Sequence, residues 1–235
     1  MKKIALLYSG QPRDIKECYK NHLQVIWEDN KEHKIDVFAH IWYDKESYFW
    51  ESYKNRGKWE SWMKQYMMDS WKPKYIEFEE PKEFVSDVWE PNPKCPHPIN
   101  NTISMFYSLY KSNQLKRRYE DENDFKYDCV VRLRTDTFFK SRIGSFFDYN
   151  LDEINLKSVP GTGYAHTEYG VEDQFAFAKS ELMDKYFDVY ENLDTIIESG
   201  SIINPETLLG WNIQIYNKVP VKKHNFNHIL WRDVK

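Results

Sequence analysis

The stretch YDCVVRLRTD, residues 127–136, begins as an apolar strand and ends in charged side chains. Because side chains alternate along a strand, Arg132, Arg134 and Asp136 are expected on one face, with apolar side chains on the other. Arginine is almost never buried unless it is paired, so a strand that ends in this way needs an anion or a carboxylate close by. We favour a ligand-binding role for this triplet. The alternative is an internal salt-bridge cluster with Asp136 and Asp128.

Short apolar runs alternate with helical patterns on both sides of this stretch. Further strands are expected at residues 3–8, 35–42, 74–78 and 173–178 and, as an extended tail, at 219–231. Apolar residues recur at helical spacing from Asp14, from Trp59 to Met67, over residues 101–119 and after Ser180 and Asn204, both expected as helix caps. The alternation predicts an α/β fold with a mixed, mainly parallel sheet flanked by helices.

Two segments between these elements stand out. Prolines crowd between residues 80 and 100 and exclude a regular element there. The helix over residues 101–119 carries Ser104, Ser108 and Ser112 as a stripe of small side chains, so this helix is expected to lie close to the sheet.

The composition is that of a globular chain and suits one domain. Of 235 residues, 41% are hydrophobic and 30% are charged, which argues against disordered and membrane classes, and no apolar run approaches a membrane span. The net charge of -4 argues against a nucleic-acid partner. The three cysteines form no CxxC pair, which predicts neither disulfides nor a zinc site and indicates a reducing, cytoplasmic location.

The residues that end or follow each strand are the candidates for a ligand site, because an open parallel sheet binds ligands outside the carboxyl ends of its strands. At three such ends the candidate binding residues are Ser9, Gly10, Gln11, Arg13, His40, Trp42, Arg132 and Arg134. Trp42 is the preferred ligand-facing tryptophan, since Trp59 and Trp62 belong to a helical stripe that favours the core.

Four motifs appear in a fixed order: SMFYSL at 104–109, YDCVVRLRTD at 127–136, DQFAF at 173–177 and PETLL at 205–209. Together they resemble the polysaccharide glycosyltransferases of bacteria, phages and large viruses that have a nucleotide-diphospho-sugar transferase fold. The resemblance implies a GT-A-like, Rossmann-type single domain over residues 1–235. Its nucleotide-binding part would cover about 1–140 and its acceptor-side part about 141–235.

The resemblance also implies an activity, the transfer of a sugar from a UDP- or GDP-sugar donor to a hydroxyl of a glycan acceptor. In such enzymes an Asp-x-Asp motif after a central strand binds a divalent metal, and Asp136 occupies the equivalent place as metal ligand and catalytic residue. Here Arg134 stands where the first acid would be. Dependence on Mn²⁺ or Mg²⁺ is therefore left open.

The departing nucleoside diphosphate needs positive charge near it whatever the family, because negative charge accumulates on it in the transition state. Arg13, Arg132 and Arg134 could supply bidentate phosphate contacts. Asp136 would then hold a metal, a ribose hydroxyl or one of the arginines, and His224 and His228 are weaker candidates as late metal ligands.

A pair of acids, Glu172 and Asp173, follows a glycine-containing segment. By the resemblance, Asp173 is the candidate general base for the acceptor hydroxyl; the alternative is a turn or cap carboxylate. Further substrate-binding candidates are Glu172, Gln174, Glu206 and His166. Glu206 matches the family's Pro-Glu pair, although a glutamate in a first helical turn already has a structural reason to be there.

Two other classes of function stay open. A non-catalytic glycan- or nucleotide-binding module of the same fold would keep the aromatic residues and lose the acid motif. Another phosphate-handling α/β enzyme would also need the arginines, although the chain has no GxxxxGK[ST] sequence, which argues against a P-loop site.

Overall fold

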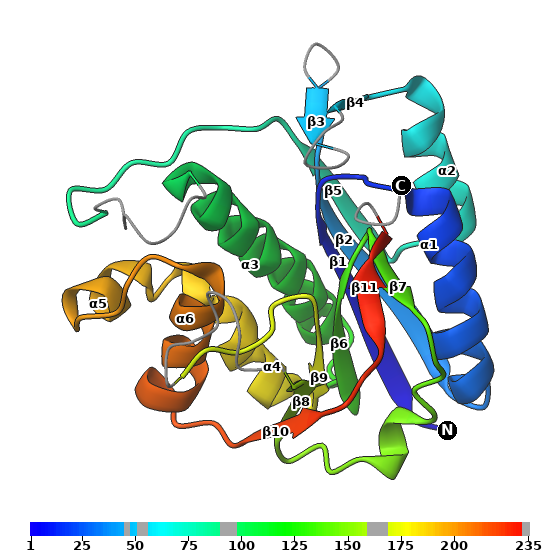
Figure 1. Cartoon of the computed structure of the whole chain (residues 1–235). Coiled ribbons are helices and arrows are strands. Elements are labelled where there is room, and N and C mark those ends of the chain that lie inside the picture. The colour runs from blue at the N-terminus through cyan, green and yellow to red at the C-terminus, as the bar shows by residue number, and fades with distance from the viewer. Residues whose placement is uncertain (45–47, 51–55, 90–97, 159–168, 232–235) are drawn as a thin grey trace.

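The computed structural model describes residues 1–44, 48–50, 56–89, 98–158 and 169–231. A seven-stranded sheet runs through the molecule with helices on both faces (Figure 1). The expected α/β architecture is confirmed.

The main sheet has the strand order β10-β8-β9-β6-β1-β2-β5. Its strands are β1 (Lys3–Gly10), β2 (Lys34–Trp42), β5 (Tyr75–Glu79), β6 (Cys129–Arg134), β8 (Ile154–Lys157), β9 (Phe175–Ala178) and β10 (Val221–His224). Neighbouring strands are parallel except at β9, which runs antiparallel to both β6 and β8. The sheet is therefore mixed and mainly parallel, as predicted, and it contains strands from both halves of the chain.

In the described residues, six α-helices flank the sheet: α1 (Ile15–His22), α2 (Ser61–Trp71), α3 (Ile99–Glu122), α4 (Ser180–Phe187), α5 (Leu193–Glu198) and α6 (Pro205–Gly210). The described chain also has π-helical turns at Leu23–Trp27 and Trp211–Tyr216 and short 3-10 turns at Glu28–Asn30, Phe146–Asp148 and Asp188–Tyr190. Helices α1 and α2 cover one face of the sheet, and α3 to α6 lie on the other (Figure 1).

Alternation along the buried strands produces two separate cores. Ala5 and Leu7 of β1 face α3, whereas Ile4, Leu6 and Tyr8 face α1 and α2. A strand buried on both faces reads as a continuous apolar run, which is why the sequence pattern predicted β1, β2 and β6 well.

Two small antiparallel sheets complete the described structure. One pairs β3 (Tyr48–Trp50) with β4 (Arg56–Lys58), and the other pairs β7 (Thr137–Phe139) with β11 (His228–Leu230). The second attaches the end of the chain to the segment that follows β6.

The predicted helix starts have different outcomes. Asn204 caps α6, since its side chain accepts from the Thr207 backbone N–H, as expected. Ser180 is not a cap: the cap position of α4 is Lys179, and the Ser180 hydroxyl instead donates to buried Glu120 at 2.7 Å. None of the helices in the described ranges combines the length and the apolar character that crossing a membrane requires.

The strand order identifies the edge where a ligand is expected. From β1 the chain continues to β2 on one side, while β6 pairs with β1 on the other side. The carboxyl ends of β1 and β6 thus form a topological switch point, the usual place for a ligand in an open α/β sheet.

Candidate functional site

The turn after β6 carries a closed cluster of charges. Arg134 donates to both carboxylate oxygens of Asp136, from Nε at 2.9 Å and from Nη2 at 3.1 Å, and Nη1 of Arg13 lies 3.6 Å from Oδ2. Burial would lower the pKa of Arg134, but Asp136 outweighs it and the pKa is raised. Asp136 is therefore the counter-ion of two arginines. Asp128, the other expected partner, binds Lys2 instead at 2.9 Å.

The donor set around Asp136 does not fit a divalent metal. Both of its oxygens accept from Arg134, so a metal would add its charge to that of two nearby guanidinium groups. In the described ranges Asp136 belongs to no group of three metal-ligating side chains. The cations that face this carboxylate come from the chain itself.

The segment after β1 is tied to the same turn. The hydroxyl of Thr135 donates to the Gln11 carbonyl and accepts from the Arg13 backbone N–H at 3.2 Å. The Arg13 side chain also donates to the Gln11 side chain. The segments that follow β1 and β6 are thus joined by hydrogen bonds, and the side chains of Gln11 and Arg13 bond to each other.

Arg132 differs from the other two arginines. Its side chain is fully buried, its guanidinium donates to the carbonyl of Leu133, and its Nε has no hydrogen-bond partner in the described chain. No carboxylate in the described ranges forms a salt bridge with it, and burial lowers its pKa, with Tyr186 and Asp173 acting in the opposite direction. A buried cation without a direct counter-ion is costly, so this position favours an anion.

Two further polar atoms at the same edge are buried without a partner in the described residues. They are the hydroxyl oxygen of Ser9 and the indole Nε1 of Trp42. Ser9 pairs in register with Arg134 of β6 and with His40 of β2, so the side chains of these three residues lie on the face of the sheet that α3 covers. An acceptor-rich ligand at the ends of β1 and β6 would satisfy the Ser9 hydroxyl together with Arg132.

His40 is part of a fixed hydrogen-bond chain rather than a free ligand. The backbone N–H of Gly10 donates to the Ser108 hydroxyl at 2.8 Å, Ser108 lies 2.9 Å from His40 Nδ1, and His40 Nε2 lies 2.9 Å from the Glu79 carboxylate. Because a carboxylate only accepts, Nε2 carries the proton, and Nδ1 faces the Ser108 hydroxyl, which also donates to the His40 carbonyl at 3.1 Å. Burial lowers the pKa of His40, so the ring is neutral.

This chain also fixes the end of β1. Gly10 has a φ of 107°, which favours glycine over any residue with a Cβ, and its N–H is held by Ser108. The serine stripe on α3 therefore does lie close to the sheet, at Ser108 and at buried Ser112.

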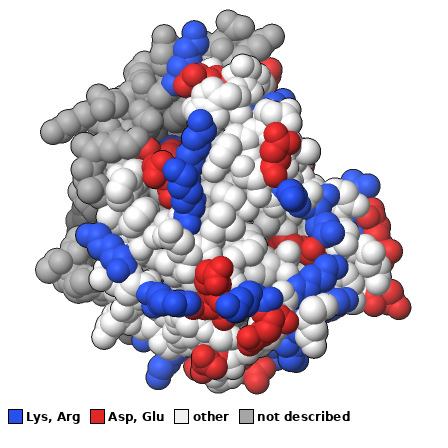
Figure 2. Space-filling view, turned by 90° about the vertical axis from the view of Figure 1, so that its right-hand side faces the viewer, with Lys and Arg blue, Asp and Glu red and all other residues white. Residues whose placement is uncertain are grey.

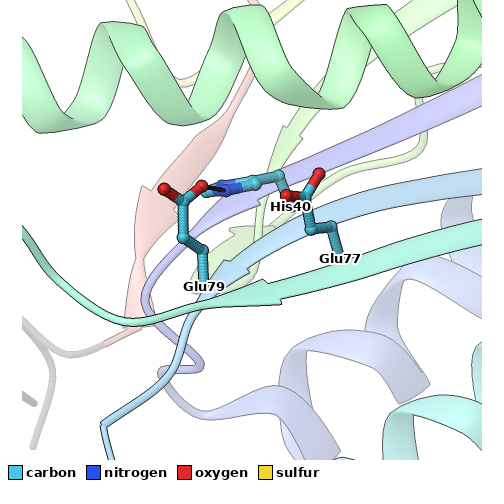
Figure 3. A group of neighbouring side chains, drawn as sticks. All are labelled: His40, Glu77 and Glu79. Carbon is cyan, nitrogen blue, oxygen red and sulfur yellow. Dashed lines mark hydrogen bonds and ion pairs between the residues drawn. The ribbon is translucent and has the colours of Figure 1, made fainter.

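Figure 3 shows His40 with Glu77 and Glu79, a group whose ligand atoms lie within 4.8 Å of one another. Three such side chains could hold a metal, but each already has partners. Glu79 accepts from Lys82 at 2.8 Å, Glu77 pairs with Lys111 at 3.1 Å, and both nitrogens of His40 are hydrogen-bonded. The two lysines balance the two carboxylates, so the group fits an internal ion-pair network.

Three acids gather opposite the arginines. Asp173 is buried, and burial raises its pKa, while Arg134 lowers it and Glu172 raises it further. Burial, followed by the Asp173 charge, raises the pKa of Glu206 to about 7. The segment before β9 and the start of α6 are joined directly, since the Val171 N–H donates to the Glu206 carbonyl at 3.1 Å.

Glu172 has a structural role of its own. One carboxylate oxygen accepts from the Phe175 backbone N–H at 3.1 Å, and the other lies 3.1 Å from His228 Nε2. The partner of His228 is therefore Glu172, whereas Asp136 was the predicted one. The partner of His224 is Asn155, at 2.7 Å. In the described residues, neither histidine forms a metal-ligating group with Asp136.

The remaining candidates are placed as follows. Gln174 is partly exposed between Asp173 and β9. His166 lies outside the described residues. Ser108 and Glu79 were not predicted, although the serine stripe on α3 was a signal for the first of them.

The surface that carries α1 and α2 has lysines and arginines interspersed with acids (Figure 2). No protein-family model and no curated protein matches the sequence. Any function must therefore be argued from the site itself.

Proposed function

We propose that the chain is a glycosyltransferase that moves a sugar from a nucleoside-diphosphate sugar to a hydroxyl of a glycan acceptor. The observation that carries the proposal is buried Arg132, which has no salt bridge in the described chain and lies near the carboxyl end of β6. Ser9, on the neighbouring strand and the same sheet face, has a buried hydroxyl with no hydrogen-bond partner in the described residues. A diphosphate supplies the acceptor oxygens that these groups lack.

The mechanism would use Asp173 as general base. Burial raises the pKa of Asp173 and so makes it a stronger base, while Arg134 and Arg132 favour its charged form. Asp173 can then accept the proton of the acceptor hydroxyl while that oxygen bonds to the anomeric carbon of the donor. The bond from that carbon to the diphosphate oxygen breaks, and its electron pair leaves with the nucleoside diphosphate. Arg132, near the end of β6, meets this charge, with no step assigned to a metal.

Glu206 would keep the acids from repelling the donor. With a pKa of about 7, Glu206 is partly protonated at neutral pH. The total negative charge of Glu172, Asp173 and Glu206 is therefore reduced. Glu206 is thus assigned to the acceptor side, together with Glu172 and Gln174.

A thermal-shift screen tests the donor assignment. The wild-type protein is heated with UDP, GDP, CMP and their sugar conjugates, each with and without Mn²⁺ or Mg²⁺. A ligand at about 100 times its Kd stabilises the fold by about 2.7 kcal/mol, a shift of roughly 5 to 10 °C for a chain of this size.

Arg132→Met should abolish this shift, and Arg118→Met, which removes an exposed arginine on α3, should not. If no nucleotide shifts the melting temperature, or if Arg132→Met shifts like the wild type, the donor assignment is wrong.

A second candidate is a non-catalytic nucleotide- or glycan-binding module. One observation favours it: Arg134 donates to both oxygens of Asp136, so this carboxylate is not available as a metal ligand or a catalytic acid. Slow hydrolysis of the donor without an acceptor would support the transferase, whereas nucleotide binding without any turnover would support the module.

We also propose a reducing, cytoplasmic location. Cys129 is a buried free thiol, which suits a reducing compartment. The net charge of -4 and the mixed surface over α1 and α2 support a partner other than nucleic acid.

A further inference from the structure

A pocket of about 550 Å³ lies between residues 85–89 and residues 190–194. It shares no lining residue with the proposed donor site, although Trp42 packs against Tyr107 behind it. Its volume falls in the range of small-molecule sites. Neither the proposed activity nor the family resemblance assigns it a ligand.

Two aromatic rings, those of Trp89 and Tyr190, line the pocket, and each has contacts that fix its position. Tyr190 packs against Tyr107 at 5.1 Å and Phe84 at 6.0 Å between ring centroids. The indole Nε1 of Trp89 donates to Asp194 Oδ1 at 2.8 Å. Both rings are half-buried, so they offer apolar surface to a ligand at little cost in side-chain entropy.

Among the described residues, the charge of the lining has one sign. Asp87, Glu191 and Asp194 are exposed carboxylates, and none of the described lining residues is a lysine or an arginine. Oδ1 of Asp194 is held by Trp89 and by Ser86 at 3.2 Å, while its Oδ2 has no hydrogen-bond partner in the described residues. Aromatic faces beside carboxylates attract cations, and an organic ammonium group uses both.

Next to the pocket, a lysine of the chain itself contacts both an aromatic ring and a carboxylate. The Lys82 ammonium lies 3.8 Å from the centroid of Tyr107 and 2.8 Å from Glu79. Tyr107 in turn packs against Tyr190, so an internal ammonium already sits on the ring cluster that backs the pocket.

We propose that this pocket binds an organic ammonium group, such as the protonated amine of an amino sugar. The ammonium would lie over the rings of Trp89 and Tyr190 and face the free oxygen of Asp194, with Asp87 and Glu191 adding long-range attraction. The proposal does not depend on nucleotide binding or on turnover.

The test is an NMR titration of the full chain with glucosamine, N-acetylglucosamine and glucose, following the indole N–H signal of Trp89, which Trp89→Phe assigns. Glucosamine should move the signal, and its affinity should fall at high salt because an exposed ion pair is screened. The other two sugars have the same ring without the cation and should not move it.

Asp194→Asn keeps the acceptor for Trp89 and removes the charge, so it should weaken glucosamine binding by about two- to fivefold. Asp152→Asn, which removes an exposed acid elsewhere, should leave binding unchanged. Equal binding of all three sugars, no movement with any of them, or full affinity in Asp194→Asn would each overturn the proposal. A negative nucleotide screen would leave this result untouched.

Discussion

Two buried cations on the α3 side of the sheet differ in how they are compensated. Lys116 is fully buried and contacts Asp184 at 2.7 Å, Ser180 at 2.6 Å and Glu120 at 3.2 Å. Arg132 is equally buried and has no salt bridge in the described chain. The first arrangement is complete without a ligand, while the second leaves a charge to be met from outside.

This difference is a physical criterion for a site. Removing one member of a complete ion-pair network lowers the free energy of unfolding. A buried charge without a counter-ion already lowers it, and a ligand that pairs with this charge stabilises the fold. If the criterion holds, variants at the two positions should have opposite effects on stability and on binding.

The largest effect is expected for turnover in Asp173→Asn. The amide keeps the shape of the side chain but cannot accept the proton, so kcat for sugar transfer should fall by about 10² to 10⁴, with a smaller change in donor KM. Steady-state kinetics with the donor found in the nucleotide screen measures this. An unchanged kcat would remove Asp173 from the mechanism.

Lys116→Met should be the most destabilising change at the saturated cluster. It removes the buried cation between Glu120 and Asp184 and leaves them only their part-exposed partners Lys126 and Arg117, which costs about 3 to 5 kcal/mol of unfolding free energy. Urea unfolding at neutral pH measures the loss. Lys111→Met is the matched control on the same helix: it breaks one half-exposed pair with Glu77 and should cost less than about 1 kcal/mol.

A buried histidine extends the comparison to pH. His22 bonds Tyr8 at 2.8 Å and the Thr137 carbonyl at 2.7 Å, and burial lowers its pKa to about 4. Between that pKa and the unfolded value of about 6.5, the unfolded chain binds more protons, so stability is lost as pH falls. The loss assigned to His22 is about 2 kcal/mol at pH 5.

Urea unfolding at pH 7 and pH 5 measures it in the wild type and in His22→Gln. The variant should be less stable at pH 7 and should lose about 2 kcal/mol less than the wild type between the two pH values. Equal losses would show that His22 does not titrate in this window.

Most of the fold follows from the sequence because its signals are local. The apolar runs of β1, β2 and β6 mark strands buried on both faces, and Asn204 with Pro205 marks the start of α6. Short elements such as β7 and β8 carry no periodic signal, since three or four residues do not complete a pattern.

The site was predicted in its residue types and less well in its contacts. The alternation of Arg132 and Arg134 places both on one face, but nothing in a strand pattern shows that Arg134 takes Asp136 and leaves Arg132 without a carboxylate. Likewise, the hydrogen-bond chain from Gly10 to His40 depends on Ser108, which lies 98 residues further along the chain than Gly10. Such partners are set by tertiary packing and lie beyond any local pattern.

The smallest predicted effect decides the comparison most directly. Arg132→Met removes a buried cation that has no direct counter-ion and keeps a side chain of similar length, so the unfolding free energy should be unchanged or rise by about 1 kcal/mol. The same variant should lose its response to nucleotides. A loss of several kcal/mol in urea unfolding would mean that Arg132 is as fully compensated as Lys116, and the site would then be an internal network rather than a place for an anion.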